Sequence, residues 1–98
     1  MSTKVLVVDD KQMMRDSVGV TLQRAGFQVI AAPDGNTALK LVVRHRPAAV
    51  ITDLKMPEMD GLELLERLRQ AEDQLPVVLM TAYGSVDSAV RAMKFGAF

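Results

Sequence analysis

Each of three apolar runs in this sequence ends at a residue that could take part in chemistry. The first run ends at Asp9 and Asp10, the second at Asp53, and the third at Thr81. In an open parallel sheet, ligands bind beyond the carboxyl ends of the strands, so we expect these side chains to meet in one crevice. Clustered carboxylates repel one another unless a cation lies among them, and hard oxygen ligands favour Mg²⁺. The sequence therefore predicts a divalent-cation site that offers a carboxylate to an electrophilic group.

Length and charge exclude several classes of protein. The chain has 98 residues, enough for one domain, and its 49% hydrophobic content is typical of a folded protein. The 12 basic and 12 acidic residues balance, so the sequence has neither a basic nucleic-acid footprint nor an acidic tail. We therefore expect no direct contact with nucleic acid.

Cysteine usage and hydropathy indicate the compartment. The sequence contains no cysteine, which excludes disulfides, thiolate-bound zinc and cysteine nucleophiles and is typical of a reducing cytosol. Its apolar runs are too short to span a membrane. The segment 1–4 leads directly into the first apolar run and does not resemble a signal peptide. We expect a cytoplasmic protein with no membrane partner.

Strand-like and helix-like segments alternate along the chain. The expected strands cover 5–8, 27–31, 49–53 and 77–81. The expected helices cover 11–25, a segment that ends near 46, a segment that follows Asp60, and a segment from Ser85 to Gly96. This alternation indicates right-handed βαβ units and a parallel sheet, and hence an α/β fold. The strand over 27–31 has the most mixed polarity, so we expect it at an edge of the sheet.

Capping residues and apolar faces define the expected helices. Gly26 ends the first helix, and Asp34 or Asn36 caps the second. Asp60 caps the third, with Glu63 at the capping-box position. Residues at helical spacing give each helix one apolar face. The faces consist of Met14, Val18, Leu22 and Ala25 in the first helix, Ala38, Leu41 and Val42 in the second, and Leu62, Leu65 and Leu68 in the third.

Three motifs carry a resemblance to a known family. They are Val7-Val8-Asp9-Asp10, Thr52-Asp53-Leu54-Lys55-Met56-Pro57-Glu58-Met59-Asp60-Gly61 and Met80-Thr81-Ala82-Tyr83-Gly84. Together they resemble the receiver domain of bacterial two-component response regulators, and the resemblance covers 1–98 as one domain. The segments 81–86 and 92–98 are similar to receivers of the nitrogen-regulator type. The resemblance implies a flavodoxin-like, doubly wound parallel sheet with the strand order 2-1-3-4.

The resemblance also implies roles for individual residues. Asp53 would accept a phosphoryl group from the phosphohistidine of a sensor histidine kinase. Asp10 and Asp53 would ligate Mg²⁺ directly, with Asp9 helping directly or through water. The backbone carbonyl of Lys55 would complete the ligands, and the Thr81 hydroxyl would hydrogen-bond a phosphoryl oxygen. Phosphoryl transfer depends mainly on positioning and charge neutralisation, which suits this set of residues.

The function implied by the resemblance is a signalling switch rather than an enzyme. Phosphorylation would bias the fourth helix and its flanking loop between two arrangements. An output domain or a downstream protein would read the change at the face formed by strand four and helix four. Receivers of the nitrogen-regulator type precede domains that regulate transcription, so we expect a transcriptional output. The domain itself would at most phosphorylate and dephosphorylate its own aspartate.

The chain departs from the family's pattern at its end. A family member continues into a fifth strand and a fifth helix, which would take roughly 20 further residues. The family lysine at the end of that strand has no counterpart, because Lys55 and Lys94 stand elsewhere. We therefore expect a receiver that is incomplete at its C-terminus. Its fourth strand would be an exposed edge, open to self-association by pairing with another chain.

Two alternative functions stay open at this point. Without the family lysine, the domain could be a phosphorylation-incompetent receiver that serves as an interaction or oligomerisation module. A Mg²⁺-dependent aspartyl phosphohydrolase is less well supported, because such enzymes usually carry a second acid two residues after the nucleophile. Lys55 occupies that position here. Phosphate uptake with Mg²⁺ separates the switch from the module, and turnover of a phosphate ester would identify the enzyme.

Overall fold

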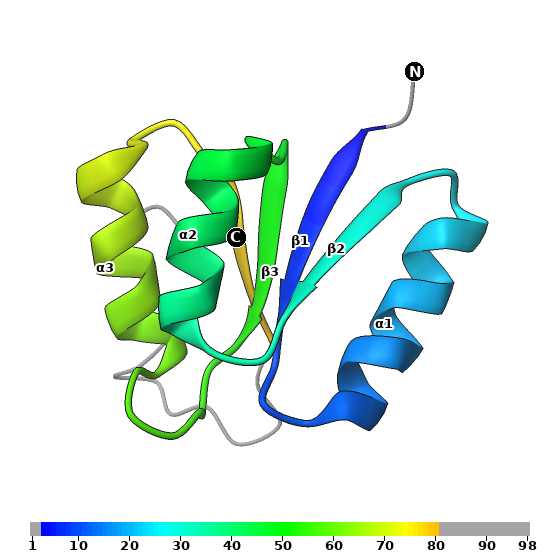
Figure 1. The fold of residues 1–98 in the computed structure, drawn as a ribbon, viewed down its shortest axis with the longest axis horizontal. Helices are drawn as coiled ribbons and strands as arrows, with labels where there is room; N and C mark the ends of the chain where they lie inside the picture. The colour runs from blue at the N-terminus through cyan, green and yellow to red at the C-terminus, as the bar shows by residue number, and fades with distance from the viewer. Residues whose placement is uncertain (1–2, 81–98) are drawn as a thin grey trace.

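The structure of this protein is a computed structural model, and it describes residues 3–80 (Figure 1). In chain order the elements are β1 (Lys4–Val8), α1 (Gln12–Arg24), β2 (Gln28–Ala32), α2 (Gly35–His45), β3 (Ala49–Asp53), α3 (Gly61–Ala71) and β4 (Val77–Met80). The alternation predicted from the hydrophobic pattern is confirmed for these elements. The helix predicted from Ser85 to Gly96 lies outside the described residues.

The strands form one parallel sheet in the order β2-β1-β3-β4. The predicted strand order is confirmed, and β2 lies at an edge, as its mixed polarity indicated. In the central pair, Val8 of β1 lies opposite Thr52 of β3. In the next pair, Asp53 of β3 lies opposite Met80 of β4. The carboxyl ends of β1, β3 and β4 therefore lie side by side, so the residues that follow them can meet.

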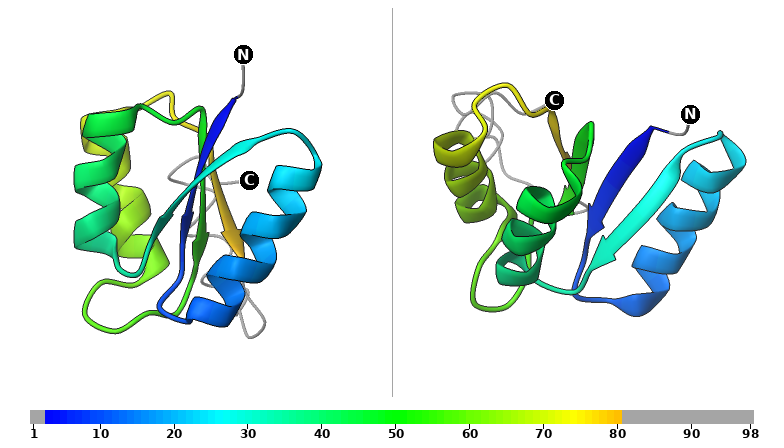
Figure 2. Two further views of the ribbon diagram at one scale, coloured as in Figure 1. Left: turned by 45° about the vertical axis from the view of Figure 1, so that its right-hand side comes forward. Right: turned by 45° about the horizontal axis from the view of Figure 1, so that its top comes forward.

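Helices lie on both faces of the sheet (Figures 1 and 2). α2 and α3 lie together on one face, and α1 lies on the other. The main core lies under α2 and α3, where Leu64, Leu65 and Leu68 are fully buried in one cluster with Leu6 and Val8. A fully buried leucine contributes about 1.5–3 kcal/mol relative to an exposed one. None of the described helices is long and apolar enough to cross a membrane.

The apolar faces predicted for α2 and α3 are confirmed. Ala38 and Val42 of α2 are buried, and Leu41 packs against the core while partly buried. The three leucines predicted to face inward from α3 are all buried. Leu64, which the prediction omitted, is buried as well. These two helices therefore supply most of the apolar surface that holds the sheet in place.

The apolar face predicted for α1 is partly wrong. Val18 and Leu22 are half-buried as predicted, but Met14 is 44% exposed. Gly19 is the buried residue of this helix. Arg15 takes the inward position near the start of the helix, because its guanidinium group donates a hydrogen bond to the backbone at the end of β1. Hydrophobic spacing does not register such a polar contact, so the prediction placed Met14 rather than Arg15 on the inner face.

Two of the predicted helix caps are confirmed. The Asp34 carboxylate accepts a hydrogen bond from the Thr37 backbone N–H at 2.7 Å, so Asp34 rather than Asn36 is the cap. The Asp60 carboxylate accepts from the Glu63 backbone N–H at 2.8 Å. The return contact of a capping box is not formed by Glu63, whose carboxylate lies 3.4 Å from Arg67 one turn along the helix. Opposite charges four residues apart attract each other on an exposed helix face, which explains this difference.

Element ends differ from the prediction by one or two residues. α1 ends at Arg24, so Ala25 is its exposed C-cap rather than part of the buried face. Gly26 follows with a φ of 97°, which turns the chain as predicted. β2 begins one residue later than predicted and leaves Phe27 exposed. β4 is described as far as Met80, and Thr81, the predicted last residue of this strand, lies outside the described residues.

Candidate functional site

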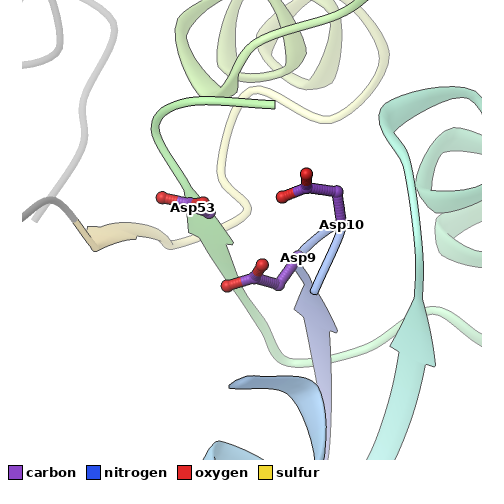
Figure 3. Close-up of side chains that lie close together, drawn as sticks. All are labelled: Asp9, Asp10 and Asp53. Atoms are coloured by element: carbon purple, nitrogen blue, oxygen red, sulfur yellow. The ribbon is translucent and has the colours of Figure 1, made fainter. Parts of the chain in front are cut away.

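Three carboxylates gather where β1 and β3 end (Figure 3). Asp9 and Asp10 follow β1, and Asp53 is the last residue of β3. Each offers an oxygen, and these oxygens all lie within 4.8 Å of one another. The convergence predicted for the three carboxylates is therefore present, because β1 and β3 are paired neighbours in the sheet. We call Asp9, Asp10 and Asp53 the acidic cluster.

The members of the acidic cluster differ in their exposure. The Asp9 side chain is 2% exposed, that of Asp53 18%, and that of Asp10 30%. A buried carboxylate is costly unless hydrogen-bond donors compensate for the lost water. For Asp9, that donor is the backbone N–H of Lys11, which lies 2.9 Å from Oδ1. Asp53 and Asp10 are more open and can reach an incoming group.

The backbone around Asp9 is held from two directions. Its N–H donates a hydrogen bond to the carbonyl of Ala32 at 3.2 Å, which ties the end of β1 to β2. Its carbonyl accepts a hydrogen bond from Nη1 of Arg15 at 2.7 Å. These contacts fix the turn that carries Asp9 and Asp10. Sequence reasoning did not assign this role to Arg15, because its signal is only a basic residue one turn into α1.

A positive side chain lies within the acidic cluster. Nζ of Lys11 lies 3.4 Å from Oδ1 of Asp10, 3.4 Å from Oδ2 of Asp53 and 4.0 Å from Oδ1 of Asp9. The attraction of Asp10, with a smaller contribution from Asp53, raises the pKa of Lys11 above its ordinary value. Lys11 was not among the residues predicted for the site, although its position directly after the paired aspartates was a usable signal.

The loop after β3 brings the start of α3 close to Asp53. The Gly61 N–H donates a hydrogen bond to the carbonyl of Leu54 at 2.8 Å. A Cβ atom at Gly61 would collide with the backbone carbonyl oxygen of Asp53, so glycine is required by this close approach. Met56 and Met59 are buried in the core, which anchors the loop from within. The motif that follows Asp53 therefore determines loop shape and the position of α3.

Two of the predicted site residues stay predictions. Lys55 lies exposed in the loop two positions after Asp53, where its carbonyl was predicted to ligate a metal ion. Thr81 lies outside the described residues, although it follows Met80, which is paired with Asp53. The end of β4 thus runs beside the acidic cluster, as the prediction for Thr81 requires.

The donor set suits a hard divalent cation. The acidic cluster offers carboxylate oxygens, which Mg²⁺ prefers and which it uses one or two at a time while keeping several waters. Asp10 and Asp53 are both partly exposed, so the cluster can be reached from solvent at these two residues. The amine of Lys11 already balances part of the negative charge, which indicates that this place in the fold accommodates a cation.

A comparison with protein families matches residues 5–98 to the response regulator receiver domain. This chain belongs to that family. The family predicted from the three sequence motifs is therefore confirmed. Domains of this family are the receiver parts of response regulators.

Curated relatives agree with the family assignment. The regulatory protein AtoC of Escherichia coli is 41% identical over 95 residues, which cover 97% of this chain and 21% of AtoC. The response regulator protein FleR of Pseudomonas aeruginosa is 43% identical over 97 residues, covering 99% of this chain and 20% of FleR. The chain spans about a fifth of the length of these two relatives. Sporulation initiation phosphotransferase F of Bacillus subtilis is 36% identical, and 78% of it is covered.

Solved structures confirm the flavodoxin-like receiver fold. The chemotaxis protein CheY4 of Vibrio cholerae matches with a TM-score of 0.94 at 33% identity, covering 99% of this chain and 82% of CheY4. A response regulator receiver domain protein of Clostridium thermocellum matches with a TM-score of 0.93 at 31% identity, covering 98% and 78%.

Proposed function

We propose that this domain is a phosphoacceptor switch in which Asp53 takes a phosphoryl group from a sensor histidine kinase. The observation that carries the proposal is the acidic cluster at the carboxyl ends of β1 and β3 in a chain of the receiver family. In the transfer, an Asp53 carboxylate oxygen forms a bond to phosphorus while the bond from phosphorus to the kinase histidine nitrogen breaks. The products are an acyl phosphate on Asp53 and an unphosphorylated histidine on the kinase.

Residues of the acidic cluster would hold Mg²⁺ during this transfer. In the proposal, Asp10 and Asp53 ligate the ion directly, Asp9 helps directly or through water, and the Lys55 carbonyl completes the protein ligands. When bound, the ion neutralises charge on the carboxylate and on the phosphoryl oxygens. Support comes from the oxygen donor set and from its close spacing.

The surrounding residues keep Asp53 and its neighbours in position. Arg15 and the Lys11 backbone N–H hold the turn at Asp9, and oxygens of Asp10 and Asp53 already lie within 4.8 Å of each other. Such preorganisation lowers the barrier because the reacting groups need not be ordered during the reaction. The Thr81 hydroxyl would donate a hydrogen bond to a phosphoryl oxygen and so report phosphorylation to the segment that follows β4.

The same proposal includes the output of the domain, its location and its self-association. The output is transcription regulation in the cytoplasm, read by an output domain or a downstream protein at the face of strand four and helix four. Self-association through the β4 edge is a further expectation, which sedimentation velocity would test. The domain acts as a switch on its own aspartate and does not turn over a separate substrate.

The decisive experiment is intact mass spectrometry after incubation with acetyl phosphate and Mg²⁺. The parent protein is expected to gain one phosphoryl group, and Asp53→Asn is expected to gain none while it keeps its circular dichroism spectrum. An adduct of equal yield on Asp53→Asn would show that another residue is the acceptor. A folded parent that takes up no phosphoryl group would indicate the alternative, an interaction module that is not phosphorylated.

A further inference from the structure

We propose that Lys11 is a built-in competitor at the cation site, so that Mg²⁺ must displace its ammonium group in order to bind. This inference rests on the proposed function, because it concerns the metal affinity of the same acidic cluster. Lys11 would thereby set the Mg²⁺ concentration at which the domain becomes competent for phosphoryl transfer.

The position of the ammonium group is the first argument. Nζ of Lys11 lies at the same distance, 3.4 Å, from an oxygen of Asp10 and an oxygen of Asp53. These two residues come from different strands, one after β1 and one at the end of β3. A magnesium ion needs its oxygen ligands at about 2.0–2.1 Å, so an ion that binds these same two oxygens takes the place of the ammonium group.

Charge balance is the second argument. The three carboxylates carry one negative charge each when ionised, and the lysine cancels one of them. An exposed lysine amine is protonated at neutral pH. The remaining negative charge still attracts a divalent ion. Lys11 therefore weakens metal binding without abolishing it.

The freedom of the side chain is the third argument. The Lys11 backbone is fixed, since its N–H donates a hydrogen bond to Asp9, whereas its side chain is 61% exposed. The ammonium group can leave for solvent by rotation of its flexible stem, while the turn at Asp9 stays in place. Ion pairs between exposed groups are weak, so an incoming divalent cation can replace this one reversibly.

Isothermal titration calorimetry with Mg²⁺ alone tests the proposal, because it does not depend on phosphorylation. Lys11→Met keeps the linear stem and removes the charge, and it is expected to bind Mg²⁺ about three- to tenfold more tightly than the parent. Lys11→Arg keeps the charge and is expected to bind with an affinity closer to that of the parent. Lys40→Met is the matched control, since it removes the same charge from the exposed surface of α2.

Thermal unfolding supplies a second readout. Without Mg²⁺, Lys11→Met is expected to unfold at a lower temperature than the parent, because the carboxylates lose their counter-charge. With saturating Mg²⁺, the variant is expected to gain more in Tm than the parent does. A purely structural role for Lys11 would lower the Tm without changing the affinity for Mg²⁺.

The outcomes separate this inference from the proposed function. Equal Mg²⁺ affinities for the parent and Lys11→Met would overturn the inference and leave the metal site intact. Tighter binding by Lys40→Met as well would also overturn it, since net charge alone would then explain the effect. If neither the folded parent nor Lys11→Met binds Mg²⁺, the metal site itself is wrong and the inference falls with it.

Discussion

At the residue scale, the three carboxylates of the acidic cluster have different surroundings. Asp9 is buried, and a backbone N–H donor holds its carboxylate in place. Asp10 and Asp53 are more open and lie on either side of the Lys11 ammonium group. This difference in exposure suits a site in which Asp9 is fixed in position while Asp10 and Asp53 can contact an incoming cation or phosphoryl group.

Asp10→Ala is expected to weaken Mg²⁺ binding by at least roughly tenfold. Loss of a residue that only hydrogen-bonds a metal ligand typically costs that much, and Asp10 is proposed to ligate the ion itself. The stability without Mg²⁺ is expected to change by less than about 1 kcal/mol, because the substitution removes both repulsion and an exposed ion pair. Calorimetry and urea unfolding measure the two effects. Asp16→Ala on the exposed face of α1 is the control with the same charge change. Equal loss of affinity in both variants would contradict the assignment of Asp10 as a ligand.

At the element scale, the loop between β3 and α3 connects the phosphoacceptor candidate to the core. Glu58 in this loop has a φ of 68°, and the Met59 N–H donates to the carbonyl of Pro57 at 2.7 Å. The loop then returns to the end of β3, where Gly61 begins α3 against the backbone of Asp53. Stability of the loop and position of Asp53 are therefore coupled.

Gly61→Ala is expected to lower the free energy of unfolding by about 1–3 kcal/mol, as overpacking does elsewhere, because backbone atoms of Asp53 and Leu54 must move. Gly19→Ala is the matched control, since its Cβ would lie 3.6 Å from a Val29 methyl group, an ordinary contact. In mid-helix this control is expected to be neutral or to stabilise by up to about 1 kcal/mol. Urea unfolding measures the free energy of unfolding of both variants. Similar values for the two would show that Gly61 is not required by its close approach to the backbone of Asp53.

The N-cap of α2 predicts a pH dependence. The hydrogen bond from the Thr37 N–H lowers the pKa of Asp34, so the ionised cap stabilises the folded state. This contribution is complete above the ordinary carboxyl pKa and is lost as the pH falls through the lowered one, that is, below about pH 4. Asp34→Ala is expected to lose about 1 kcal/mol at neutral pH.

The control for this prediction is Asp34→Asn, which caps without titrating. Between neutral pH and about pH 3, the parent is expected to lose more stability than the asparagine variant. Denaturant unfolding at both pH values measures this difference. An identical pH dependence for parent and variant would show that the cap contributes nothing that titrates.

At the scale of the whole molecule, the acidic cluster exists only in the folded state. Asp53 is far from Asp9 and Asp10 in sequence, and the pairing of β1 with β3 brings it to them. The surrounding helices hold that pairing in place, mainly through the core under α2 and α3. A ligand of the cluster therefore binds the folded chain and stabilises it.

Mg²⁺ at about 100 times its Kd is expected to stabilise the protein by about 2.7 kcal/mol, the value for a single site that the unfolded chain lacks. For a domain of this size the Tm would rise by several degrees. Thermal unfolding with increasing MgCl₂ measures the effect, with matched additions of NaCl as the control for ionic strength. A Tm that rises equally in both salts would exclude a specific site.

Much of this arrangement was determined by the sequence itself. The order of strands and helices follows from the alternation of buried β-branched runs with helical periodicity. The caps at Asp34 and Asp60 were predictable because a cap is a contact between residues only three positions apart. The family was evident from three motifs, and it supplied the strand order.

Only the tertiary structure decided the contacts between distant segments. It brought Lys11 to Asp53 and the Arg15 guanidinium group to the backbone carbonyl of Asp9. It also set Gly61 against the backbone of Asp53. Local patterns report how a segment meets its own neighbours, whereas these contacts depend on the pairing of β1 with β3 and on the packing of helices against them. The sequence thus determined which carboxylates are present, and the fold placed the Lys11 ammonium group among them.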